Sequence, residues 1–140
     1  MVTHSLKKSL HYHVYNRGVS QRKIFLNEAD YRFFMYKIAF YKLKYSIELI
    51  TYCLMPNHFH LLLKSGQETI KVSKFMHGLQ LSYAKYFNRN YSHKGHVFES
   101  RYHFKEVVTP KSLMNVIDYI RQNPVKKKLV VAPEEWPYLT

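Results

Sequence analysis

The spacing of apolar residues changes along the chain, and the changes predict where strands and helices follow one another. Alternating or β-branched stretches predict strands at 9–16, 46–54, 58–64 and 103–109. Turn residues at 55–57 separate the second stretch from the third, so these two strands are expected to form an antiparallel hairpin.

Three other segments repeat their apolar residues at the spacing of a helix. Asn27 is expected to cap a helix that runs to about residue 45, and a long helix is expected from about 69 to 90. Thr109 followed by Pro110 predicts the start of a third helix, which the Asn-Pro pair at 123–124 is expected to end. The predicted apolar stripes consist of Tyr31, Phe34, Ile38, Tyr41 and Tyr45, then Val72, Phe75, Met76, Leu79, Tyr83 and Phe87, then Leu113, Met114, Ile117 and Ile120.

The resulting order, β-α-β-β-α-β-α, indicates an α+β protein. We expect a ferredoxin-like or RRM-like antiparallel sheet of four or more strands, with helices packed on one face and the other face available for function. No internal repeat or linker divides the sequence, so residues 1–140 are expected to form a single domain, with the tail 125–140 packing loosely on the body.

The net charge of the chain indicates a class of binding partner. Lysine and arginine number 22 against 9 acidic residues, a formal net charge of +13, and 13 tyrosines and 9 phenylalanines are mixed among them. Basic groups neutralise phosphates and aromatic faces stack on exposed bases, so single-stranded nucleic acid is the leading partner. The alternative is that the aromatics are core residues and the lysines serve solubility.

Cysteine content and hydropathy exclude other classes. The single cysteine, Cys53, excludes an internal disulfide framework and fits a reducing compartment. No uncharged stretch approaches the length of a membrane span, and the first residues lack the apolar core of a signal peptide. We expect a soluble cytoplasmic protein with no membrane partner.

Two histidines in the stretch "NHFHLLL" are the first candidates for chemistry. In a strand, His58 and His60 point to one side and Phe59 to the other, so the pair could hold a metal ion or could be two ordinary histidines on a half-polar strand. Tyr119 and Asn123 lie four apart and are neighbours on the third helix. A phenol and an amide oxygen beside two imidazoles would suit attack on a phosphate, although a packing tyrosine and a helix stop are the structural alternatives.

Three longer blocks, in this order, carry a resemblance to a known family: "YCLMPNHFHLLLK", "GHVFESRYHFKEV" and "YIRQNPVKKKLV". Together with "HYHVYNRG" and "FLNEADYRFFMYKI" they resemble the single-tyrosine transposases of the HUH superfamily, over nearly the whole chain. The "YIRQNPV" block is more similar to the REP-associated branch than to the insertion-sequence branch, where glutamine usually occupies the position of Asn123. Both side chains offer the same amide oxygen.

The resemblance implies a mechanism and a set of site residues. It implies that His58, His60 and Asn123 bind a divalent metal ion, Mg²⁺ or Mn²⁺, and that Tyr119 attacks a phosphodiester of single-stranded DNA, with hairpin structure in the substrate. The product would be a 5′-phosphotyrosine intermediate and a 3′-hydroxyl, and attack by a 3′-hydroxyl would later rejoin strands. Relatives of the insertion-sequence type are dimers that can share active sites, whereas REP-associated relatives can act as monomers, so a homodimer is one open alternative.

Basic residues in the same blocks are candidate DNA contacts. Arg17 and Arg101 are expected to contact phosphate or bases, and Lys126 and Lys127 to hold the strand, with a solvated charge run as the alternative for the lysines. The remaining histidines are interpreted more simply. His11 and His13 share a strand face but are expected to be structural, and a group near 93–103 is expected to face solvent or DNA: His93, His96 and His103.

Two other hypotheses compete with the transposase. A non-catalytic module that binds single-stranded nucleic acid would explain the basic and aromatic composition, but it gives no reason for the histidine pair or for Tyr119 and Asn123. A metal-stabilised structural domain would need four ligands, and two histidines and one asparagine leave that arrangement incomplete.

Overall fold

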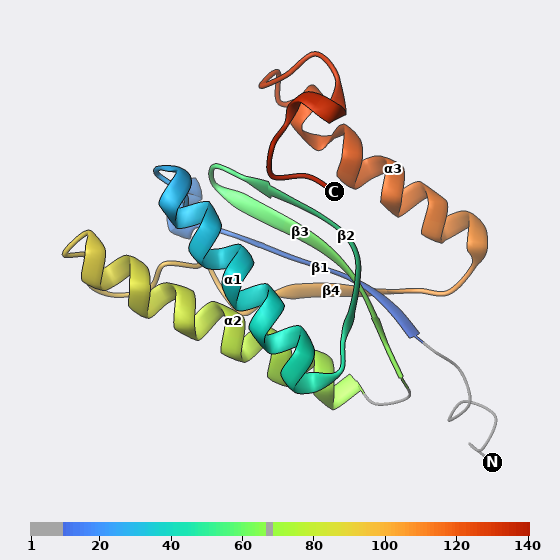
Figure 1. Cartoon of the computed structure of the whole chain (residues 1–140), viewed down its shortest axis with the longest axis horizontal. Coiled ribbons are helices and arrows are strands. Elements are labelled where there is room, and N and C mark those ends of the chain that lie inside the picture. The colour runs from blue at the N-terminus through green and yellow to red at the C-terminus, as the bar shows by residue number, and fades with distance from the viewer. Residues whose placement is uncertain (1–9, 67–68) are drawn as a thin grey trace.

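Four antiparallel strands in the order β2-β3-β1-β4 form the sheet around which this computed structural model is built (Figure 1). The structure describes residues 10–66 and 69–140, so the first residue of the strand predicted at 9–16 lies outside the described part. The strands are β1 (Leu10–Arg17), β2 (Glu48–Met55), β3 (His58–Ser65) and β4 (His103–Val107). The predicted α+β class and the antiparallel sheet are confirmed.

The hairpin between β2 and β3 determines which side chains share a face of the sheet. Met55 pairs with His58 across the turn, as predicted, and β3 pairs on its other edge with β1, where Arg17 lies opposite His58. Alternation along β3 places Phe59 in the larger core cluster, fully buried, and turns the flanking histidines to the opposite face. Phe59 therefore anchors the strand beneath the histidine pair.

Two helices cover the face of the sheet that carries Phe59: α1 (Glu28–Tyr45) and α2 (Thr69–Asn90) (Figure 1). The Asn27 side chain caps α1 by accepting from the backbone N–H of Asp30 at 3.1 Å, as predicted. The buried residues of α2 are the six predicted ones, whereas in α1 burial is confined to Asp30 and three of the five predicted residues: Tyr31, Phe34 and Ile38.

The third helix, α3 (Pro110–Lys126), lies over the opposite face of the sheet (Figure 1). Thr109 caps it through the N–H of Ser112 at 3.0 Å. The expectation that the helices pack on one face of the sheet is therefore wrong for α3. The apolar stripe of α3 must be buried against other apolar residues, and the face opposite α1 and α2 provides them. Ile120 packs there with four buried residues: Cys53, Met55, Leu62 and Val107.

Two details of α3 were predicted wrongly. The helix does not stop at Asn123 and Pro124 but continues to Lys126, and the N–H of Lys127 still bonds to the Asn123 carbonyl at 3.0 Å. A proline removes the bond that its own N–H would make and its ring crowds the carbonyl one turn earlier, and burial of Pro124 offsets that cost close to the helix end. Met114, predicted on the apolar stripe, is instead 57% exposed.

The C-terminal tail pairs with the edge of the sheet rather than packing loosely. After the short 3₁₀ turn η3 (Pro133–Glu135), the indole N–H of Trp136 donates to the Leu54 carbonyl at 2.9 Å. The backbone N–H of Leu54 in turn donates to the Tyr138 carbonyl, and that of Thr140 to the Tyr52 carbonyl. These bonds attach the tail to β2, and Arg121 of α3 pairs with Glu134 of η3 at 3.2 Å. Across the described ranges, no helix is apolar and long enough to cross a membrane.

Candidate active site

A cleft of about 460 Å³ opens between the α3-facing side of the sheet and α3 itself. Residues far apart in sequence line it, from β1 and the segment after it, from the turn and strand of the hairpin, from β4 and the segment before it, and from α3 and its C-terminal end. Those used below are Tyr15, Asn16, Arg17, Gln21, Asn57, His58, His60, Glu99, His103, Tyr119, Asn123 and Lys127. The cleft therefore brings together all four residues expected to carry the chemistry.

The histidine pair lies on the floor of this cleft. His58 is half-buried and His60 is 6% exposed, and their rings meet edge to face with centroids 5.2 Å apart. Burial is the largest cause that lowers the pKa of both imidazoles, to about 3 for His60, where the neighbouring His58, His13 and Lys127 lower it further. Both imidazoles are therefore neutral near pH 7, which is the protonation state that ligates metals.

Tyr119 and Asn123 approach the histidines from α3, one helical turn apart. Oδ1 of Asn123 lies 2.9 Å from Nε2 of His58, and the amide is 3% exposed. The Tyr119 ring meets that of His60 edge to face at 5.4 Å, yet the residue remains 45% exposed. The amide is thus fixed against the sheet, whereas the phenol is accessible to a large substrate.

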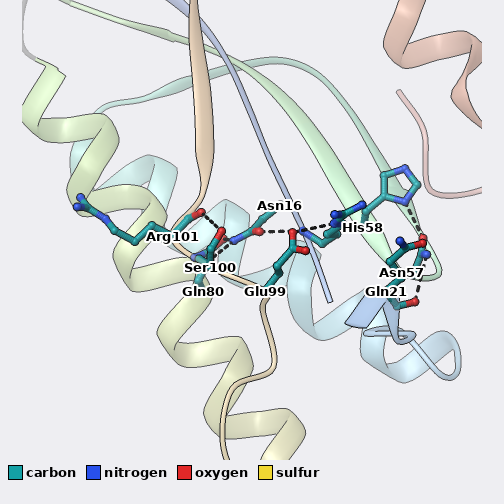
Figure 2. A network of polar contacts seen from close by, with 9 residues as sticks. Asn16, Gln21, Asn57, His58, Gln80, Glu99, Ser100 and Arg101 are labelled. Carbon is teal, nitrogen blue, oxygen red and sulfur yellow. Dashed lines mark hydrogen bonds and ion pairs between the residues drawn. The ribbon is translucent and has the colours of Figure 1, made fainter. Parts of the chain in front are cut away.

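The hydrogen bonds of His58 test whether a cation fits between these groups. Nδ1 of His58 lies 2.7 Å from Oδ1 of Asn57, whose amide is oriented by donation from its Nδ2 to the Gln21 carbonyl at 3.3 Å (Figure 2). A neutral imidazole has one N–H, so it cannot donate to the oxygens of both Asn57 and Asn123. With the proton on Nδ1, a lone pair of Nε2 faces the Asn123 oxygen, and a divalent cation would satisfy both atoms.

The donor set is mixed rather than a cluster of ionisable ligands. Among residues 10–66 and 69–140, no group of three or more His, Cys, Asp and Glu side chains is placed to hold a metal ion. The candidate ligands are two imidazole nitrogens and one amide oxygen. Three protein ligands would leave coordination positions of a metal ion for substrate oxygens, as in an open catalytic site rather than a closed structural one.

His13 is the residue that reasoning from the sequence missed. Its Nε2 lies 3.0 Å from Nδ1 of His60, and its ring stacks on that of His60 with centroids 5.2 Å apart. Burial is the main cause that lowers the pKa of His13 to about 4. The sequence does place His11 and His13 on the same face of one strand, because they lie two residues apart. The contact with His60 could be found after that strand, β1, had been placed beside β3.

The candidate DNA contacts divide between two regions. Arg17 and Lys127 line the cleft, and Nζ of Lys126 lies 5.6 Å from the centre of the Tyr119 ring. Arg17 pairs there with Glu99 at 2.7 Å. Arg101 instead lines a second groove of about 650 Å³ between α2 and the segment before β4.

A buried amide joins the two regions. Nδ2 of Asn16 donates to Oε1 of Gln80 at 2.8 Å and to the Ser100 carbonyl at 2.9 Å, which ties the segment carrying Glu99 and Arg101 to β1 and α2 (Figure 2). The three histidines near 93–103 lie in different places. His103 lines the cleft and its ring stacks on that of Tyr15 with centroids 5.2 Å apart, whereas His96 lines the second groove. His93 contacts Asn88 at the end of α2.

Comparison with known proteins finds a matching family model and individual relatives. A family model described as "Transposase IS200 like" matches residues 6–123. A Haemophilus influenzae protein named as a REP-associated tyrosine transposase is 28% identical over an alignment of 104 residues, and the match covers 67% of this chain. The matched region is 58% of that relative, so this chain spans less than two thirds of the relative's length.

Two solved structures share the fold. One is a REP-associated tyrosine transposase bound to a REP hairpin, with a TM-score of 0.77 and 20% identity over 96% of this chain and 77% of that one. The other is a Deinococcus radiodurans R1 protein described as a transposase, with a TM-score of 0.60 and 18% identity over 81% of this chain and 89% of that one.

Proposed function

Since the chain belongs to the IS200-like transposase family, as its resemblance to single-tyrosine transposases predicted, we propose that it cleaves and rejoins single-stranded DNA through Tyr119. The observation that carries the proposal is the meeting of Tyr119 and Asn123 with His58 and His60 in one cleft. A structural domain or a simple binding module has no need of this constellation.

Tyr119 is the nucleophile in this proposal. Its phenolic oxygen attacks the scissile phosphorus, the bond from phosphorus to the 3′-oxygen breaks, and the 3′-oxygen leaves with a proton as a hydroxyl. The 5′-phosphate remains on Tyr119 as a phosphotyrosine. A 3′-hydroxyl then attacks that phosphorus, releases the phenol and restores a phosphodiester without an external energy source. The exposure of Tyr119 suits this role, because the attacked strand must reach it from solvent.

His58, His60 and Asn123 would hold the divalent metal ion. When bound, the ion supplies charge neutralisation at the scissile phosphate. Manganese accepts imidazole more readily than magnesium does, so we expect both to support activity and manganese to bind more tightly. The chain's own contribution is to keep both imidazoles neutral, with His60 buried and His58 half-buried, and to orient one amide oxygen toward His58.

The proposed substrate is single-stranded DNA that contains a hairpin. A relative of the same fold has been solved bound to a REP hairpin, and the net charge of +13 suits a polyanion. Arg17, Lys126 and Lys127 surround the cleft and would contact the strand near Tyr119, whereas Arg101 would contact it further away, in the second groove.

A labelled hairpin-bearing single strand incubated with the protein and Mn²⁺ tests the proposal. The wild type is expected to form a denaturant-resistant adduct, and Tyr119→Phe to lose it while it retains DNA binding. Tyr36→Phe is the matched control, because Tyr36 is 63% exposed on α1, across the sheet from the cleft. Adduct at the wild-type level in Tyr119→Phe would overturn the assignment. Binding without adduct in the wild type would favour the non-catalytic module.

A further inference from the structure

His13 lies behind one of the proposed ligands and is held there from several sides. It is 8% exposed in the middle of β1, where it pairs with Leu62 of β3 and Lys105 of β4. The rings of Tyr15 and Tyr119 contact it, with centroids 4.9 Å and 6.1 Å from its own. The imidazole therefore has little room to turn, and its Nε2 stays 3.0 Å from Nδ1 of His60.

The contact between these imidazoles limits the tautomer of His60. A neutral imidazole carries a proton on one nitrogen and a lone pair on the other. If His60 ligates a metal ion through Nε2, its Nδ1 carries the proton and needs an acceptor, and the acceptor within reach is Nε2 of His13. His58 shows the same arrangement, with Nδ1 on Asn57 and Nε2 toward Asn123.

We propose that His13 is a positioning residue that accepts the Nδ1–H of His60 and thereby directs Nε2 of His60 into the cleft. The inference rests on the function proposed above, in which His60 is a metal ligand. Partners of this kind fix the tautomer and the ring orientation of ligating histidines, and their loss typically lowers metal affinity by about 10- to 100-fold. His13 contacts the Tyr119 ring as well, so the same side chain supports the nucleophile.

Three variants test the role of His13. His13→Leu removes the acceptor at similar size, and His13→Gln places an amide oxygen where Nε2 lies. His11→Leu is the matched control, because His11 lies two residues away on the same strand face but is paired with Lys64 and Val107, away from His60. Histidine ¹⁵N NMR of the metal-free protein in EDTA reports the tautomer of His60, and titration calorimetry reports Mn²⁺ affinity.

We expect His60 to carry its proton on Nδ1 in the wild type, in His11→Leu and in His13→Gln, and to populate both tautomers in His13→Leu. Mn²⁺ affinity should fall about 10- to 100-fold in His13→Leu and recover most of that loss in His13→Gln. A proton on Nε2 of His60 in the wild type, or wild-type affinity in His13→Leu, would overturn the role of His13.

The NMR readout keeps the inference testable if His13→Leu does not fold, because the wild type and His13→Gln report the tautomer without it. Failure of the two proposals can also be told apart. A wild-type protein that binds no Mn²⁺ would overturn the metal site, and with it the proposed function. Wild-type Mn²⁺ affinity that survives in His13→Leu would overturn the role of His13 alone.

Discussion

Nε2 of His58 and Oδ1 of Asn123 lie 2.9 Å apart although 65 positions separate them in the sequence. The contact joins β3 to α3 at the point where the helix continues through Pro124. With the proton of His58 on Nδ1, a lone pair and an amide oxygen meet here in a part-buried place, the arrangement that a cation would stabilise.

Replacement of Asn123 tests this contact. Asn123→Leu keeps the size and removes the oxygen, and it is expected to lower Mn²⁺ affinity by at least about 10-fold because a direct ligand is lost. Asn123→Gln offers the same oxygen on a longer side chain and is expected to keep part of the affinity. Calorimetric titration with Mn²⁺ measures both. Equal affinity in Asn123→Leu and the wild type would exclude Asn123 as a ligand.

Acid is expected to destabilise the metal-free protein. Burial lowers the pKa of His13 to about 4 and that of His60 to about 3, whereas both titrate near 6.5 when unfolded. The unfolded state therefore binds more protons as pH falls below about 6.5, and each histidine costs about 1.4 kcal/mol of stability per pH unit down to about pH 4.

Urea unfolding in EDTA at pH 7.5, 6 and 5 measures this slope. His13→Gln should unfold with a shallower dependence on pH, because one titrating group is removed. An unfolding midpoint that does not change between pH 7.5 and 5 in the wild type would contradict the buried, neutral state of these imidazoles.

Much of the fold could be predicted because its signals are local. The caps Asn27 and Thr109 and the turn before His58 depend on a few adjacent residues, and the structure contains each of them where the sequence indicated. The local rule failed at Pro124, where tertiary burial of α3 outweighs the lost backbone hydrogen bond and the steric cost of the proline ring.

The site was only partly predictable because part of it depends on strand order. Tyr119 and Asn123 could be found through their spacing and the resemblance of their block. The contact of His13 with His60 follows from the pairing of β1 with β3, and no local pattern in β1 predicts that pairing. Asn57 is similar: its position in the turn was predictable, but its bond to His58 depends on the carbonyl of Gln21 that orients the amide.

A complete site within one chain is expected from the contact between His60 and Tyr119, whose rings meet at 5.4 Å without a second subunit. Mixing Tyr119→Phe with His58→Ala protein tests this directly. Neither chain then holds both the nucleophile and the full ligand set, so the mixture should form no adduct. Recovered cleavage in the mixture would mean that α3 completes the site of a partner subunit. Light scattering on the same samples determines whether the protein is a dimer.

Lys127 is expected to contribute to DNA affinity through charge. It lines the cleft beside Asn123, so a strand that reaches Tyr119 passes close to its ammonium group. Lys127→Ala should weaken binding to every single-stranded sequence alike and reduce the slope of log affinity against log salt by about 0.7, the value for one phosphate contact on a single strand. Lys44→Ala is the matched control, because Lys44 lies in the last turn of α1, across the sheet from the cleft. Fluorescence anisotropy between 50 and 200 mM salt, with labelled single strands, measures the slope. Equal slopes for Lys127→Ala and Lys44→Ala would place the strand elsewhere on the molecule.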